Sequence, residues 1–405
     1  MAADEARRRC LRLDLCRIAS VFAALWAFNG ALLATPRTPA GDSEVVESLP
    51  LVSGWSGRQR ALRRELTQRP QDERVALEAA RSYLTMARTE GDARFAGYAA
   101  GALQAWDALP LTRVPVGILV MRATVAQFLH DFDASESMLR AALARQPGNA
   151  QAWITLATIQ RVRGRYAESD AACRELGRAG GGAASYGVAC LAENAGLRGD
   201  AAGARKALRG LLADPAVAGP GQAGTRQWLL TSLAEIEELA GRPVAAEAAY
   251  REALELDRSG YTLLAYVDFL FHERRPASVA PLLARDARSD AVLLRLAMAE
   301  RLDGAADRPR PAAEELRSRF EAAALRPGST TAHAREEALF ALDVQGDALR
   351  ALALARTNVE VQREPIDLLI YARAAVAAGD GKARDDVRKL VQQMGLRDAR
   401  IDSIL

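Results

Sequence analysis

The chain has 405 residues, of which 50% are apolar and only 5% aromatic, and its formal net charge is +3. A charge this small for the length gives no broad electrostatic attraction to nucleic acid, so we expect no nucleic-acid partner. Alanine and leucine supply most of the apolar share, which favours close helix packing over β-sheet. We therefore expect an all-α protein.

The first 35 residues have the layout of an export signal. Arginines between Arg7 and Arg17 precede an apolar stretch from Ile18 to Ala34, and Pro36 ends it. As a helix, this stretch would span roughly 25 Å, a little less than the ~30 Å hydrocarbon core. We expect a cleaved signal; the alternative is an uncleaved anchor, because cleavage after Ala34 would leave Leu32 where a small residue is preferred. Both place the rest of the chain in the periplasm, the second with a membrane tether through residues 18–34.

Residues 36–57 are rich in proline, glycine and serine and are expected to form a tether. A charged helix follows from Arg58 to Gln68, and the segment 58–405 then has the pattern of consecutive helix pairs. The predicted pairs are 73–110, 116–149, 150–183, 185–216, 227–258, 261–288, 290–326, 332–363 and 365–395.

Glycine and proline mark the boundaries of these predicted helices. Glycine relieves the steric cost of a left-handed backbone at a helix end, and proline stops a helix by removing a hydrogen-bond donor. The turns within pairs carry Gly91, Gly164, Gly199, Gly241, Gly304, Gly346 and Gly379, and the breaks between pairs carry Pro110, Pro147, Pro215 and Pro327.

Two units repeat each other at a spacing of 34 residues. The matching positions are Ala123 and Ala157, Phe132 and Tyr166, Leu139 and Cys173, and Leu143 and Gly177. A period of 34 with two helices per copy is typical of a tetratricopeptide solenoid.

Individual residues carry this resemblance to the tetratricopeptide repeat family. In 150–183 they are Trp153, Leu156, Ala157, Gly164, Tyr166 and Cys173, and in 227–258 they are Leu230, Leu233, Ala234, Gly241, Ala246, Tyr250 and Ala253. The likeness covers roughly 73–395 and is weakest at 261–326. It implies an α-solenoid of about eight to nine stacked antiparallel helix pairs forming a right-handed superhelix. The order of signal, tether and repeats also resembles exported bacterial tetratricopeptide proteins of unassigned role.

Catalytic and metal-binding patterns find little support. His130, His272 and His333 fall in different repeats without Cys or Asp neighbours at ligand spacing, so surface or groove histidines are expected. The nucleophile-elbow, zinc-protease and phosphate-loop motifs do not occur. We expect no enzyme activity, cofactor or metal.

Cys173 and Cys190 are the candidate disulfide. Cys173 falls on the inner side of a second helix and Cys190 near the middle of the next first helix, and these two faces pack together in a solenoid. In an oxidising compartment the sulfurs can bond across the repeat junction. The alternative is two small buried thiols that serve only in packing.

The candidate binding residues project from the first helix of each pair into a concave groove. They are Thr124, Gln127, Thr158, Arg161, Glu193, Trp228, Glu235, Glu238, Phe269, His272, Met298, Arg301, Glu336, Phe340 and Arg373. We expect an interaction scaffold outside the cytoplasm that holds a peptide segment or partner protein in this groove. The alternatives are an accessory or regulatory subunit tethered near an envelope enzyme or membrane complex, and an enzyme with an unrecognised site. The partner and the oligomeric state do not follow from the sequence.

Overall fold

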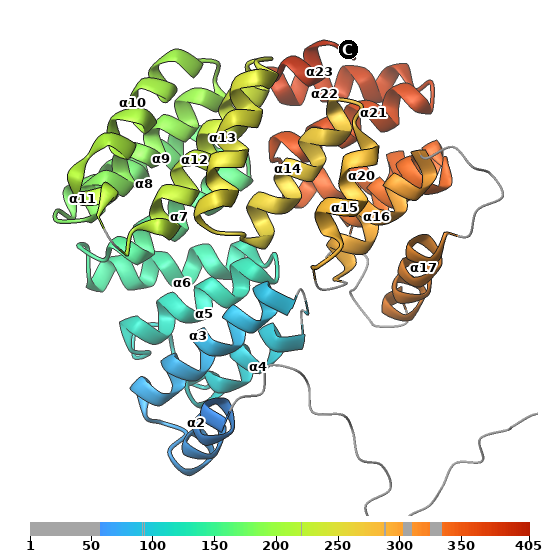
Figure 1. The fold of residues 1–405 in the computed structure, drawn as a ribbon. Coiled ribbons are helices and arrows are strands. Elements are labelled where there is room, and N and C mark those ends of the chain that lie inside the picture. Colours follow the sequence, from blue (N-terminus) through green and yellow to red (C-terminus); the bar gives the residue numbers. More distant parts are fainter. Residues whose placement is uncertain are drawn as a thin grey trace, which may run out of the picture. The chain divides into compact units, whose positions relative to one another are not determined.

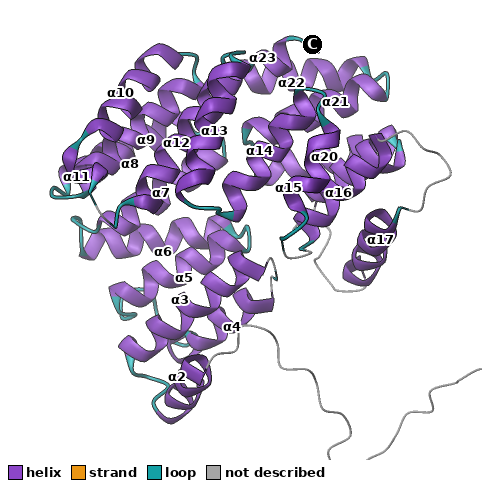
Figure 2. Cartoon of the chain, viewed as in Figure 1, coloured by secondary structure: helices purple, strands orange, loops and turns teal. Residues whose placement is uncertain are grey.

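The computed structural model describes residues 57–405 except 91, 93, 220, 287–288, 303–309 and 325–333. The described secondary structure is helical and contains no strand (Figure 2). The predicted signal, 1–35, and all but the last residue of the predicted tether, 36–57, lie outside the described residues.

The described helices are too short or too polar to cross a membrane.

Helices follow one another along the chain with short connections (Figure 1). The first half contains α2 (Gly57–Gln68), α3 (Glu73–Glu90), α4 (Arg94–Ala102), η1 (Gln104–Trp106), α5 (Val116–Phe128), α6 (Phe132–Arg145), α7 (Ala150–Val162), α8 (Tyr166–Arg178), α9 (Ala183–Leu197), α10 (Ala201–Ala213) and α11 (Pro215–Ala218). The second half contains α12 (Ala223–Leu239), α13 (Pro243–Leu256), α14 (Gly260–His272), η2 (Pro276–Ser278), α15 (Val279–Leu283), α16 (Asp290–Leu302), α17 (Pro311–Ala324), α19 (Ala334–Leu339), η3 (Phe340–Gln345), α20 (Ala348–Val361), α21 (Pro365–Ala377), α22 (Gly381–Met394) and α23 (Ala399–Asp402).

These helices pack as hairpins that stack in series. The two helices of each pair contact each other, as in α5 with α6, α7 with α8 and α12 with α13. The first helices also contact one another in order, α5 with α7, α7 with α9, α9 with α12, and α12 with α14. This confirms the all-α, tetratricopeptide-like solenoid.

One geometry recurs in most of the turns inside pairs that the structure describes. One residue takes a left-handed conformation, and the amide after it donates to a carbonyl five residues back, which closes the helix end in the Schellman manner. The amide of Arg165 donates to Gln160 at 2.8 Å, that of Asp200 to Ala195 at 2.9 Å, and that of Arg242 to Glu237 at 2.9 Å. The left-handed residue is glycine in these three turns, whereas His130 and Arg274 fill it elsewhere.

Aspartate begins several of the second helices. Asp131, Asp200, Asp347 and Asp380 each follow the left-handed turn residue, and each carboxylate accepts from an amide in the first turn of the next helix. A carboxylate at this position satisfies one of the amides that a helix start leaves unpaired. Turn and cap together fix where the second helix starts.

The pair at 260–283 is the least regular, at the place where the family resemblance is weakest. Its second helix is reduced to η2 and the short α15. Further along, the first helix of the pair at 334–361 ends in a π-helical turn, η3, before Gly346. Its end is closed by a hydrogen bond from the amide of Asp347 to the carbonyl of Ala341, 2.8 Å long.

Small residues set how closely neighbouring helices approach. A Cβ atom on Gly187 of α9 would lie 2.7 Å from the Cα atom of Gly177 on α8 and 3.0 Å from the carbonyl oxygen of Cys173. Because these atoms belong to the backbone, a side chain there must push the two helices apart. The contact between α8 and α9 therefore depends on Gly187.

Gly187→Ala should destabilise the protein by about 1–3 kcal/mol, because a methyl group forced against backbone atoms strains a packed interface. The matched control is Gly177→Ala, since a Cβ on Gly177 meets no atom within 4 Å. That control should leave stability unchanged or raise it by up to about 1 kcal/mol through helix propensity. Urea unfolding measures both, and equal effects would contradict this account of the interface.

Candidate binding site

Polar side chains on four consecutive first helices form one surface made of two hydrogen-bonded groups, which meet on α12 where Ser232 and Glu235 are three residues apart. We call it the inner face, and it consists of Arg161 on α7, Glu193 on α9, Ser232 and Glu235 on α12, and Tyr261 on α14. These helices contact one another in order, which brings side chains from far apart in the sequence together. Arg161, Glu193 and Glu235 are predicted groove residues that the structure brings together in this set.

Arg161 and Glu193 form the first link of the inner face. The Arg161 guanidinium makes an ion pair with one carboxylate oxygen of Glu193, and the Ser232 hydroxyl donates to the other. The Arg161 side chain is 23% exposed. The pair therefore joins three helices and still contacts solvent.

Glu235 and Tyr261 form the second link. The Tyr261 hydroxyl donates to Oε1 of Glu235 at 2.6 Å, while 66% of the Tyr261 surface stays exposed. The Glu235 carboxylate and then burial raise the pKa of Tyr261 well above its usual value, so the phenol remains a donor. The result is an exposed aromatic ring held in place by a carboxylate.

The pKa of Glu235 is raised to about 7, chiefly by burial. The nearby carboxylates of Glu193, Glu364 and Glu238 contribute to this rise, and the hydrogen bond from Tyr261 opposes it. Glu193, Glu238 and Glu364 each pair with an arginine, whereas Glu235 accepts a hydrogen bond from Tyr261. It changes charge near neutral pH.

The pKa of Glu364, just before α21, shifts in the opposite direction. Burial alone would raise the pKa of its carboxyl, but Arg335 and Arg161 together lower it. Because Arg161 belongs to α7, the start of α21 lies close enough to the inner face for their charges to interact.

Glu238 of α12 holds a second polar cluster near the end of that helix. One carboxylate oxygen lies 2.8 Å from Nδ1 of His272 and 2.8 Å from the Arg400 guanidinium, and the other accepts from the Tyr250 hydroxyl at 3.0 Å. Burial would raise the pKa of Glu238, but Arg400 and His272 lower it. The predicted groove histidine is thus tied to the end of the chain.

The structure corrects three predicted groove residues. Phe269 is 1% exposed and packs against Tyr250 and Tyr266, and Phe340 is 3% exposed and meets Phe320 edge-on at 5.6 Å. Met298 is also buried in the core. Large apolar side chains at these positions fill the space between helices instead of facing a ligand.

The other predicted residues are spread over the array. Thr124 and Thr158 bond the carbonyls of Val120 and Ile154 in their own helices, each at 2.9 Å. Trp228 is half-buried and stacks on Tyr186, with ring centroids 5.6 Å apart. The remaining positions are the half-buried Gln127 and Glu336, the exposed Arg301, and Arg373, which pairs with Asp343 at 3.1 Å.

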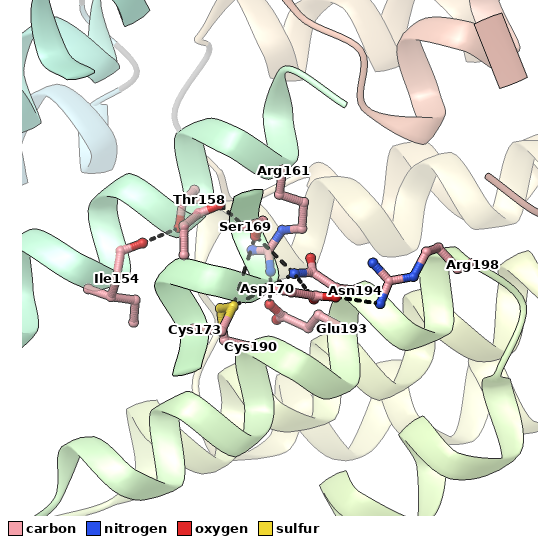
Figure 3. The surroundings of a disulfide bond; sticks show 11 residues. Ile154, Thr158, Arg161, Ser169, Asp170, Cys173, Cys190, Glu193, Asn194 and Arg198 are labelled. Carbon is pink, nitrogen blue, oxygen red and sulfur yellow. Dashed lines mark hydrogen bonds and ion pairs between the residues drawn. A yellow bond between two sulfur atoms is a disulfide. The ribbon is translucent and has the colours of Figure 1, made fainter. Parts of the chain in front are cut away.

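Cys173 of α8 and Cys190 of α9 lie at the interface that Gly187 narrows. Their Cα atoms are 5.6 Å apart, and the structure joins the sulfur atoms in a disulfide (Figure 3). Both cysteines are buried. The Asn194 amide beside them donates to Ser169 and Asp170, each at 2.9 Å, and Arg198 pairs with Asp170 at 2.8 Å. Polar bonds therefore reinforce the same contact between α8 and α9.

Sequence reasoning missed Tyr261, Ser232 and Glu364. Tyr261 is the second residue of α14, ahead of the template positions from which groove residues were chosen. Glu364 lies about 200 residues from Arg161 in sequence, so no local spacing signals their approach. Within the described residues, no group of three or more His, Cys, Asp or Glu side chains is arranged to hold a metal ion.

No family model matches the sequence, and no curated protein matches it. Among solved structures it is similar to a tetratricopeptide repeat protein from Parabacteroides merdae, with 12% identity, 65% of this chain and 90% of that chain covered, and a TM-score of 0.40. It is also similar to the P58(IPK) TPR domain (15% identity, 80% and 95% covered, TM-score 0.22) and to yeast Tom70 (11%, 83% and 84%, 0.26). These values are low, so the tetratricopeptide-like fold stands on the helix pairs and turns described above.

Glu235→Gln should stabilise the protein at pH 8 by about 1–2 kcal/mol, after allowance for solvent screening. A carboxyl whose pKa is raised to about 7 in the folded chain favours folding when protonated, so stability falls as pH rises from about 4.5 to above 7. The substitution should flatten that dependence, measured by urea unfolding at pH 5 and pH 8. The control is Glu252→Gln at an exposed position of α13; an unchanged slope in the Glu235 variant would refute the shift.

We propose that Cys173 and Cys190 are bonded in the mature protein. The full chain carrying Cys10→Ser and Cys16→Ser, denatured without reductant, should then show no free thiol. Reduction should lower the free energy of unfolding by about 3 kcal/mol, given the length of the closed loop. Two free thiols per chain would show instead that the cysteines only pack.

Proposed function

We propose that this chain is a non-enzymatic protein-interaction scaffold outside the cytoplasm, and that its inner face binds a peptide segment of a partner protein. The observation that carries the proposal is Tyr261, a large exposed aromatic ring whose hydroxyl is fixed by Glu235 of the neighbouring first helix. Aromatic side chains that are held rigid lose little entropy on binding and are common at interface hot spots.

The rest of the inner face supplies polar specificity beside this ring. Arg161 and the buried Ser232 both bond Glu193, so a partner meets an arginine and a carboxylate whose positions are set in advance. A stack of consecutive first helices offers such groups along a continuous surface, which suits an extended segment or a helix.

The placement outside the cytoplasm draws support from two features. The sequence begins with a basic and then apolar stretch typical of export. The cysteine pair has the Cα separation of a disulfide, a bond that persists in oxidising compartments and is rare in the cytosol.

A photo-reactive amino acid in place of Tyr261 tests the proposal in cells that produce the full chain. It should capture one defined protein, whereas the same residue in place of Tyr98 should not. Tyr98 is a matched control because it is 51% exposed but lies on α4, the second helix of its pair.

Binding of the captured partner should then weaken about tenfold or more in Tyr261→Ser, the effect of losing one hot-spot side chain. It should be unchanged in Tyr98→Ser. No capture from position 261, or equal capture from both positions, would contradict binding at the inner face.

A further inference from the structure

The end of the chain lies along the turns of three consecutive helix pairs. A Cβ on Gly164 would meet the Met394 side chain at 2.8 Å, one on Gly199 would meet Cγ of Arg397 at 2.9 Å, and one on Gly241 would meet Cβ of Ala399 at 3.3 Å. The order along the tail follows the order of the turns. These glycines therefore allow both the left-handed turn and the close passage of the tail.

Backbone donors from the last part of the chain reach the ends of the first helices. The amide of Arg397 donates to the carbonyl of Leu197, the last residue of α9, at 2.9 Å. The amide of Arg363 donates to the carbonyl of Val162, the last residue of α7, at 2.7 Å. Carbonyls at a helix end have no partner within the helix, so these two bonds satisfy groups that otherwise need water.

At α12, the next first helix after α7 and α9, the corresponding contact is an ion pair. The Arg400 guanidinium binds Glu238 in the last turn of α12 at 2.8 Å, and Asp398 orients it with a second bond of 2.7 Å. A cation near the carboxyl end of a helix also interacts favourably with the helix dipole. Three consecutive first helices, α7, α9 and α12, are thus each engaged at the same end.

Apolar contacts anchor the tail beside these polar bonds. Leu396 and Ile401 are buried in one core cluster with Tyr166, Leu197 and Leu239 of the earlier pairs. The short α23 contacts both α12 and α21, so it joins parts of the array far apart in sequence (Figure 1).

We propose that residues 394–401 are an intramolecular latch: they dock on the turns at Gly164, Gly199 and Gly241 and hold the pair at 365–394 against the pairs at 150–256. This places Glu364 near Arg161, beside the inner face. Release of the latch should therefore widen access to the inner face. The inference rests on the contacts of the tail and of Arg363, and it holds whatever partner the inner face binds.

The test compares glycine substitutions in the full chain that differ in whether the tail packs against the turn. Gly199→Ala strains a turn with φ of +95°, and its Cβ also collides with Cγ of Arg397, whereas Gly164→Ala strains a turn with φ of +73° and meets the flexible Met394 side chain. Gly346→Ala and Gly379→Ala strain left-handed turns with φ of +73° and +68° but meet no atom within 4 Å. Amide hydrogen exchange at Arg397 reports whether the tail stays docked, and exchange at Arg363 reports whether the start of α21 stays against α7.

Exchange at these two amides should speed up about tenfold or more in Gly199→Ala, as expected for local opening, and stay unchanged in the two controls. It should speed up less in Gly164→Ala, because the Met394 side chain can shift. Arg400→Gln removes the ion pair of the tail with Glu238 and leaves the turns intact, and it should also accelerate exchange at Arg397. Equal effects in both glycine sets would overturn the latch. So would a dimer in which the tail docks on a second copy, detected by the mass of the protein in solution.

Discussion

The tight turn between the two helices of a pair is the constraint on which the rest of the structure depends. A residue in the left-handed region and a hydrogen bond five residues back close the first helix, and a capping side chain often starts the second. Each turn makes a hairpin that cannot bury its apolar face alone, so consecutive hairpins stack. The turns then lie on one edge of the stack, where glycine leaves room for the end of the chain.

Stacking gives neighbouring helices two different kinds of contact. Where a first helix packs against the second helix of the preceding pair, small residues such as Gly187 allow close backbone approach and bring Cys173 to Cys190. On the side of the first helices, polar side chains such as Arg161 and Glu193 link one helix to the next while keeping contact with solvent. The first kind holds the array together, and the second leaves a surface that a partner can use.

The local parts of this structure could be predicted from the sequence, because they depend on spacing. The 34-residue match and the turn glycines predicted the helix pairs, and the template assigned Arg161, Glu193 and Glu235 to the same groove. The prediction that Phe269 and Phe340 face the groove was wrong. An aromatic residue at such a position can also turn into the core, and spacing does not distinguish a groove residue from a core residue. The approach of Arg400 to Glu238 was not predictable, since it joins residues far apart in the chain.

Amide hydrogen exchange at the turn residues tests the recurring turn most directly. The amides of Arg165, Asp200 and Arg242 lie in short connections but donate to carbonyls of the preceding helix. If the turns have this geometry, these amides exchange as slowly as the helix interiors beside them in all three turns. Exchange at the rate of an open loop in these turns would contradict it, because the hairpins would then lack the geometry that lets them stack.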